Sequence, residues 1–145
     1  MLIRASELAA AVAERVNPAL PEGFSVVATD DVLRVQSSST WTSAATYLAS
    51  MTVGGEDNME LPDGAVPREY LFDRIAGAIE QFLSNLQDYV SEELTVPWPQ
   101  ERTSKRMAMA MPFVAFDGQR LRSGFGDPHQ PSVEFPAIEL TPLLR

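Results

Sequence analysis

Cysteine is missing from the 145-residue sequence, and histidine and lysine occur once each. Without cysteine the chain has no disulfide, no thiolate nucleophile and no sulfur ligand for a metal, a composition that suits a reducing cytoplasm. A zinc or iron site would have to combine the single His129 with carboxylates. We therefore expect no metal ion and no other cofactor.

Long hydrophobic runs are also missing. No apolar run approaches the ~20 residues that a membrane-spanning helix needs. The first residues, Met1 to Glu7, lack the basic start and the apolar stretch of a secretory signal. These two absences predict a protein that is made in the cytoplasm and does not enter a membrane.

Basic residues are outnumbered, with 20 acidic against 11 basic ones and a net charge of −9. This charge repels phosphate backbones, so we expect no general binding to nucleic acid. Residues 1–100 carry fifteen acids and five bases, whereas residues 101–145 carry five acids and six bases. A chain polarised in this way could stack head to tail as a homo-oligomer, although solubility alone also explains a surplus of acid.

What is present is the composition of a folded protein. Hydrophobic residues make up 45% of the sequence, and the length suits a single domain over residues 1–145 with a core of its own. Near the N-terminus, Ser6 is a candidate N-cap for a helix over about residues 7–17. Leu8, Val12 and Val16 form its apolar stripe, and the following Asn17-Pro18 ends it.

Strands follow this helix. Residues 24–28 and 32–37 read as a hairpin that turns at residues 29–31. Residues 44–53 favour another strand, with a short helix as the alternative. Residues 54–66 contain adjacent glycines and two acidic clusters, which predict a long acidic loop. Its carboxylates do not have the spacing of a calcium-binding loop, and we interpret them as a partner-binding surface. They are Glu56, Asp57, Glu60 and Asp63.

The strongest pattern lies in the middle of the chain. Large apolar residues recur there at steps of three and four, which predicts a helix of about 27 residues, or roughly 40 Å, beginning at Pro67. They are Phe72, Ile75, Ile79, Phe82, Leu86 and Tyr89, widened into a face by Leu71, Ala78, Leu83, Val90 and Leu94. We expect this spine to pack on a sheet, with room for a partner along one flank. The prolines of Val96-Pro97-Trp98-Pro99 end it.

The last third is predicted to be β structure. Met107, Met109 and Met111 alternate on one face, and Asp117-Gly118 indicates a hairpin between residues 113–116 and 119–122. Residues 124–131 read as a second loop. The final strand covers residues 133–140, where Pro136 indicates an edge or a bulge. The predicted class is α+β, in the order α-β-β-(β)-α-β-β-β. An antiparallel sheet packs on the long central helix, beside a shorter N-terminal helix.

Catalytic signatures are weak. His129 lies in a loop pattern typical of a solvated side chain, and no serine sits in a nucleophile elbow. The carboxylate pairs Asp30-Asp31 and Glu92-Glu93 are placed in a turn and at a helix end, and no glycine-rich stretch opens a helix as a phosphate loop does. We therefore expect a non-enzyme. A small enzyme with an unfamiliar carboxylate site is the weaker alternative.

Two further groups are candidate partner-binding residues. Trp41 and Trp98 belong to the residue type enriched at interface hot spots, although tryptophan also fills cores. The only basic cluster follows the long helix. It could meet an acidic patch on a neighbouring subunit or complement the dipole at the helix C-terminus. This cluster consists of Arg102, Lys105 and Arg106.

The stretch from Leu86 to Glu93, the stop at Pro97-Trp98-Pro99 and the later Gly126-Asp127 resemble a group of small uncharacterised proteins of actinobacteria and their phages. The resemblance covers residues 67–140 and implies no catalytic residues. It favours a structural, non-catalytic subunit of a multi-chain assembly that ends in a virion, such as a phage head–tail connector or a tail-end ring protein. A stand-alone adaptor or regulator that binds one folded protein is the alternative.

Overall fold

The computed structural model describes residues 3–39, 42–48, 67–100 and 110–144. The fold is α+β, and the predicted element order is confirmed, including the bracketed third strand. The first half contains α1 (Ala5–Val16), β1 (Phe24–Thr29), β2 (Val32–Ser37) and β3 (Ser43–Tyr47). The second half contains α2 (Pro67–Leu94), β4 (Pro112–Asp117), β5 (Arg120–Asp127) and β6 (Gln130–Glu139). Short 3₁₀ turns follow α1 at Asn17–Ala19 and β6 at Thr141–Leu143.

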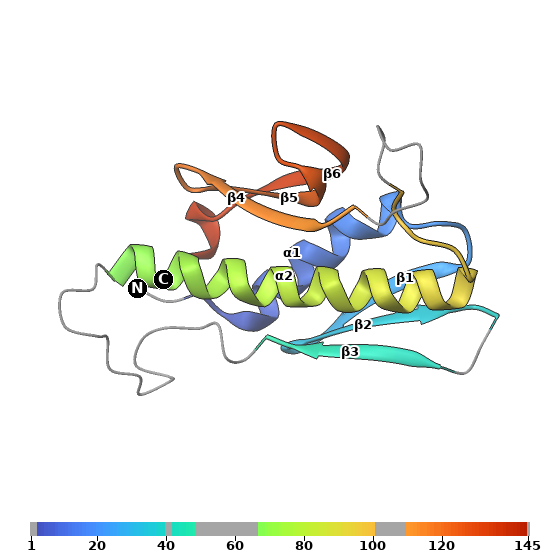
Figure 1. Ribbon diagram of the computed structural model, residues 1–145. Coiled ribbons are helices and arrows are strands. Elements are labelled where there is room, and N and C mark those ends of the chain that lie inside the picture. Colours follow the sequence, from blue (N-terminus) through green and yellow to red (C-terminus); the bar gives the residue numbers. More distant parts are fainter. Residues whose placement is uncertain (1–2, 40–41, 49–66, 101–109, 145) are drawn as a thin grey trace.

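The elements form three layers (Figure 1). The strands make two antiparallel three-stranded sheets, β1-β2-β3 and β4-β5-β6. Both helices lie between them, because α1 packs on β1 and β6 while α2 packs on β3 and β4. We predicted one antiparallel sheet packed on the long helix. The structure has two such sheets, one on each side of the helical layer.

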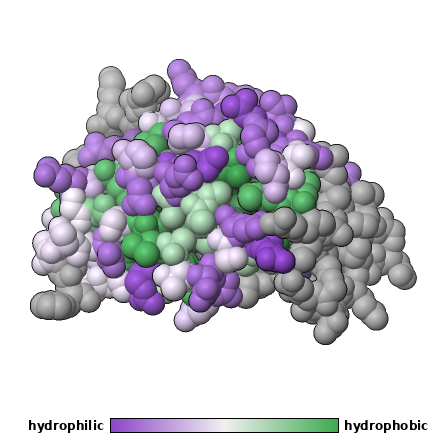
Figure 2. Space-filling model, turned by 180° about the vertical axis from the view of Figure 1, so that it is seen from behind, coloured by the Kyte–Doolittle hydropathy of each residue, from purple (hydrophilic) through white to green (hydrophobic). Residues whose placement is uncertain are grey.

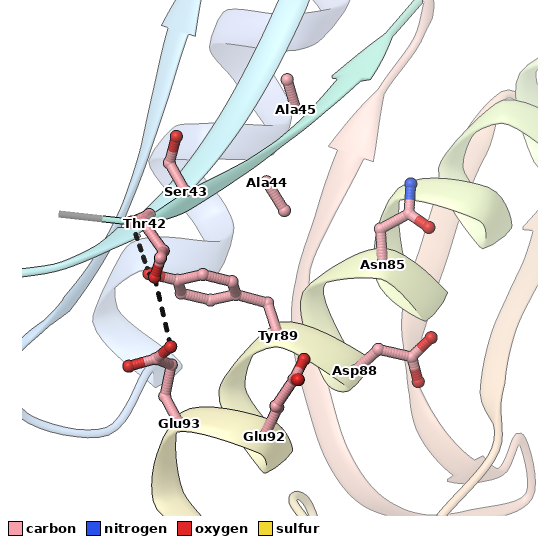
Figure 3. A pocket seen from close by; sticks show the side chains of 9 residues that line it. All are labelled: Thr42, Ser43, Ala44, Ala45, Asn85, Asp88, Tyr89, Glu92 and Glu93. Atoms are coloured by element: carbon pink, nitrogen blue, oxygen red, sulfur yellow. Dashed lines mark hydrogen bonds between the residues drawn. The ribbon is translucent and has the colours of Figure 1, made fainter. Parts of the chain in front are cut away.

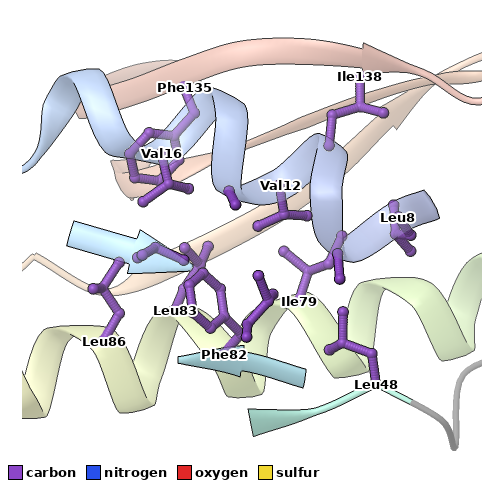
Figure 4. Close-up of a cluster of buried hydrophobic side chains, with 14 of the residues drawn as sticks. Leu8, Val12, Val16, Leu48, Ile79, Phe82, Leu83, Leu86, Phe135 and Ile138 are labelled. Atoms are coloured by element: carbon purple, nitrogen blue, oxygen red, sulfur yellow. The ribbon is translucent and has the colours of Figure 1, made fainter. Parts of the chain in front are cut away.

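The helix α2 is the spine of this arrangement. It begins at Pro67, the position predicted from the fixed backbone of proline, and it ends at Leu94. Thr95 then adopts a left-handed conformation with φ of 60°, and Pro97 follows shortly after. All six residues of the predicted seam are buried. Figure 4 shows Phe82, Leu83 and Leu86 facing residues of α1 and β6 in this core.

Most of the wide apolar face of α2 is covered by this chain itself. Leu71, Leu83 and Val90 are fully buried between the helix and its own sheets. Ala78 is only partly buried and Leu94 keeps 36% of its surface exposed, so part of this face stays accessible along one flank of the helix.

The prediction of Ser6 as the N-cap is wrong. The helix α1 begins at Ala5, and Arg4 occupies the cap position without a side-chain hydrogen bond to the backbone. The neighbouring Ile3 is fully buried and forms an isolated bridge with Leu144. Because this long-range contact fixes the chain immediately before the helix, the local capping preference of Ser6 does not set its start.

The predicted loop over residues 124–131 is also wrong. The strand β5 continues to Asp127 and β6 starts at Gln130, so only Pro128 and His129 lie in the turn. A Cβ atom on Gly124 would lie 2.1 Å from the carbonyl oxygen of Val133, so the two strands approach each other closely there. The glycines that suggested a loop instead serve a bulged hairpin. His129 is exposed, as predicted.

The edge position of β6 confirms the expectation drawn from Pro136. The strand lies at the end of its sheet, and its register with β5 shifts between Leu121 and Ser123, opposite Pro136. On the outer face of this sheet, Arg122 forms an ion pair of 2.7 Å with Glu134. Arg120 on the same strand pairs with Glu139 at 3.4 Å, so charged side chains from both β5 and β6 occupy this face.

The molecular surface on the side away from α2 mixes polar and apolar residues (Figure 2). Hydrophobic residues gather near the middle of this view, and hydrophilic ones lie around and across them. Within residues 3–39, 42–48, 67–100 and 110–144, neither helix is long and apolar enough to cross a bilayer.

Candidate functional site

A groove of about 520 Å³ lies between β3 and the C-terminal half of α2. We call it the β3–α2 groove (Figure 3). One wall is a short run of small residues at the start of β3, and the other wall is a polar face of α2. The lining residues are Thr42, Ser43, Ala44, Ala45, Asn85, Asp88, Tyr89, Glu92 and Glu93.

The groove continues along the same two elements as a second hollow of about 290 Å³. Asn85 donates a hydrogen bond of 2.9 Å to the hydroxyl of Thr46 and separates the two hollows. The second one is lined by Thr46, Tyr47, Arg74, Gly77, Ala78 and Gln81. The small side chains of Ala44, Ala45 and Gly77 explain why the helix and the strand do not fill the space between them.

Tyr89 anchors the helix to the sheet beside the groove. Its hydroxyl accepts a hydrogen bond of 3.1 Å from the backbone N–H of Ser37 and donates one of 2.7 Å to the carbonyl of Thr42. The ladder between β2 and β3 ends at the pair Gln36 and Ser43, and if it continued by one residue Ser37 would pair with Thr42. The phenol therefore bridges two backbone groups at the end of the ladder. The ring is 9% exposed and makes an edge contact with Phe24.

The wall formed by α2 is acidic. Asp88, Glu92 and Glu93 all line the groove, and no basic residue occurs among the nine lining residues. Glu93 accepts a hydrogen bond of 3.2 Å from the hydroxyl of Thr42, while Asp88 and Glu92 are exposed. Within the part of the chain that the structure describes, no three histidine, aspartate or glutamate side chains gather as a metal site.

The strand β3 presents unpaired backbone groups to this groove. Leu48 donates to the carbonyl of Asp31, and hydrogen-bonded pairs alternate along an antiparallel ladder. It follows that Ala44 and Thr46 bond to β2, whereas the backbone groups of Ser43, Ala45 and Tyr47 point away from it. Among the described residues β3 pairs with β2 alone, and no other described strand lies beside its outer edge.

The other three edge strands each carry a feature that hinders pairing. On β1, the side-chain amide of Asn17 accepts from the N–H of Val26 and donates to its carbonyl, both at 2.7 Å. On β6, Arg15 donates to the carbonyl of Ala137, and the strand contains two prolines. The strand β4 starts with Pro112.

Proline, charge and covering side chains are the usual means by which proteins block strand edges. The sequence of β3 is Ser-Ala-Ala-Thr-Tyr, which contains neither proline nor a charged residue. Tyr47 at its end is 69% exposed. Thus β3 differs from the other edges in offering both its backbone and an exposed aromatic ring.

Of the residues predicted to bind partners, the structure describes Trp98. Its ring packs edge-on against Phe125 with 5.5 Å between centroids, and it is partly buried against the core. Ser91 holds its backbone through two hydrogen bonds. Trp98 is therefore a packing residue of the junction between α2 and the second sheet. The other candidates lie outside the described residues: Trp41, Glu56, Asp57, Glu60, Asp63, Arg102, Lys105 and Arg106.

The groove residues were not predicted as a site. A signal did exist, because residues 81, 85, 88 and 92 share one polar helix face at steps of four, three and four. The opposite wall comes from a strand about forty residues away in the sequence, and no local pattern connects the two. Comparisons with protein-family models, with curated proteins and with solved structures find no match to this chain.

Proposed function

We propose that this protein is a non-catalytic interaction subunit that joins other protein chains through the edge of β3. The observation that carries the proposal is the contrast between β3 and the three hindered edges. An unpaired edge offers a row of N–H and carbonyl groups to an incoming strand, which is a recurrent mode of protein recognition. The exposed ring of Tyr47 adds apolar contact area at the same place.

A phage head–tail connector or a tail-end ring protein is the more specific form of this proposal. It rests on the resemblance of residues 67–140 to small actinobacterial and phage proteins and on the uneven charge of the chain. A ring needs two different complementary surfaces on each subunit. The open edge of β3 equally fits a stand-alone adaptor that binds one folded protein, which is the second candidate.

Native mass spectrometry tests the proposal on the unmodified chain, first alone and then mixed with the proteins encoded beside its gene. A ring protein gives a closed oligomer with one fixed number of subunits, and an adaptor gives a complex with one partner. A strict monomer in both samples would contradict the proposal. Neighbouring portal or tail genes favour the connector over the adaptor.

A further inference from the structure

We infer that the β3–α2 groove receives an extended segment of a partner chain with basic side chains on the side that faces α2. This inference rests on the proposed function and adds the chemistry of the partner. It combines two independent features of the same place: the unpaired backbone of β3 and the acidic wall of α2.

The backbone of β3 determines the conformation of the bound segment. Ser43, Ala45 and Tyr47 present their N–H and carbonyl groups outward at every second position. Only an extended chain repeats its own donors and acceptors with the same spacing. The segment therefore adds a fourth strand to the sheet β1-β2-β3.

The side chains of an added strand alternate between the two faces of the sheet. Those on the helical side enter the groove, which Asn85, Asp88 and Glu92 line (Figure 3). Those on the other side lie beside the exposed ring of Tyr47. Every second residue of the segment therefore contacts the groove, and these residues determine which sequences bind.

Charge complementarity makes the groove-facing positions basic. The hollow beside Thr42 and Ser43 contains three carboxylates and no basic group, so a lysine or arginine there gains partners. The hollow beside Tyr47 contains Arg74 and no acidic group. The basic side chains are therefore expected at the Ser43 end of the segment and not at its Tyr47 end.

A second copy of this chain fits the groove less well. Pairing two β3 strands would place Ser-Ala-Ala-Thr-Tyr in each groove, a sequence without any basic residue. It would also join two chains that each carry a net charge of −9. Electrostatic complementarity therefore favours a basic segment over the pairing of two β3 strands.

The test uses the full chain, isotope-labelled for NMR, and two synthetic peptides, one alternating threonine with lysine and the other threonine with glutamate. We expect the lysine peptide to shift the backbone amides of Ser43, Ala45 and Tyr47 and the side-chain amide of Asn85. The glutamate peptide should bind at least about tenfold more weakly. Equal affinity for the two peptides, or shifts centred elsewhere, would overturn the inference.

Two charge variants separate the groove from the overall charge of the chain. Asp88→Lys with Glu92→Lys reverses two exposed lining residues and should weaken the lysine peptide about tenfold. Glu14→Lys with Glu22→Lys makes the same change in net charge at exposed positions outside the groove. This control should alter binding by less than about twofold. Equal losses in the two variants would mean that attraction is non-specific and would overturn the inference.

Ala45→Pro removes one outward N–H without breaking a bond to β2, and should weaken the lysine peptide roughly fivefold. If this variant does not fold, the two charge variants still test the inference. Dimers of the unmodified chain that Ala45→Pro abolishes would show a second copy in the groove and overturn the inference. If complexes with neighbouring proteins persist while both peptides fail to bind, the inference is wrong and the proposed function stands.

Discussion

The hydroxyl of Tyr89 donates a 2.7 Å hydrogen bond to the backbone carbonyl of Thr42, although the two residues are 47 positions apart. The same hydroxyl accepts from the N–H of Ser37, so α2 completes the end of the β2–β3 ladder. The phenolic oxygen of Tyr89 therefore joins the β2–β3 ladder and the hydrogen bond from Asn85 to Thr46 in holding β3 beside α2 and in shaping the groove.

Tyr89→Phe tests this contribution. The variant keeps the ring and leaves one buried N–H and one carbonyl without their shared partner, so we expect a loss of about 1–3 kcal/mol in the free energy of unfolding. Urea denaturation measures this loss, and faster hydrogen exchange at the amide of Ser37 locates it. Tyr47→Phe is the matched control, because that side chain is 69% exposed and should change stability by less than about 0.5 kcal/mol. Equal effects in both variants would contradict the bridging role.

Asn17 protects the edge of β1, and its removal should both destabilise and expose that edge. The side chain exchanges two hydrogen bonds with Val26 and donates a third to the carbonyl of Ala13. Asn17→Ala should cost about 1–3 kcal/mol and increase self-association, because a second edge becomes free to pair. Thermal unfolding and light scattering measure the two effects. Gln36→Ala, at an exposed position of β2, serves as the control and should leave both unchanged.

Local patterns predicted the elements of this fold better than their ends. The helix α2 could be read from the sequence because its apolar spacing extends over 28 residues and prolines mark both ends. The start of α1 could not, since the bridge between Ile3 and Leu144 sets it. The strand over residues 124–127 was missed because glycine is ambiguous between a loop and a close strand contact.

The groove could not be predicted for a related reason. The sequence places Glu92 and Glu93 at a helix end, and this is their observed position. What makes them part of a site is the strand that lies opposite, and the distance between two elements depends on packing across the whole core. Edge protection also depends on packing, because the hydrogen bonds between Asn17 and Val26 require α1 to lie against β1.

Replacing glycine with alanine should change the stability of the protein in opposite directions at two positions. At Gly124 an added Cβ would lie 2.1 Å from the carbonyl oxygen of Val133 and 2.9 Å from the Cα of Glu134. Both contacts are with backbone, so Gly124→Ala should cost at least about 1–3 kcal/mol or separate the two strands. Gly77 lies inside α2 with nothing within 4 Å of the added atom, so Gly77→Ala should stabilise by about 0.5–1 kcal/mol. Chemical denaturation of both variants measures whether the free energy of unfolding falls for Gly124→Ala and rises for Gly77→Ala.

Trp98 offers a final test that separates packing from partner binding. Its ring contacts Phe125, and its backbone is held by Ser91. Because a partly buried ring is lost, Trp98→Ala should lower the free energy of unfolding by about 2–4 kcal/mol. Trp98→Phe should recover about half of that loss by keeping an aromatic contact with Phe125. If Trp98→Ala instead leaves stability unchanged and abolishes a complex with another chain, the ring belongs to an interface and not to the core.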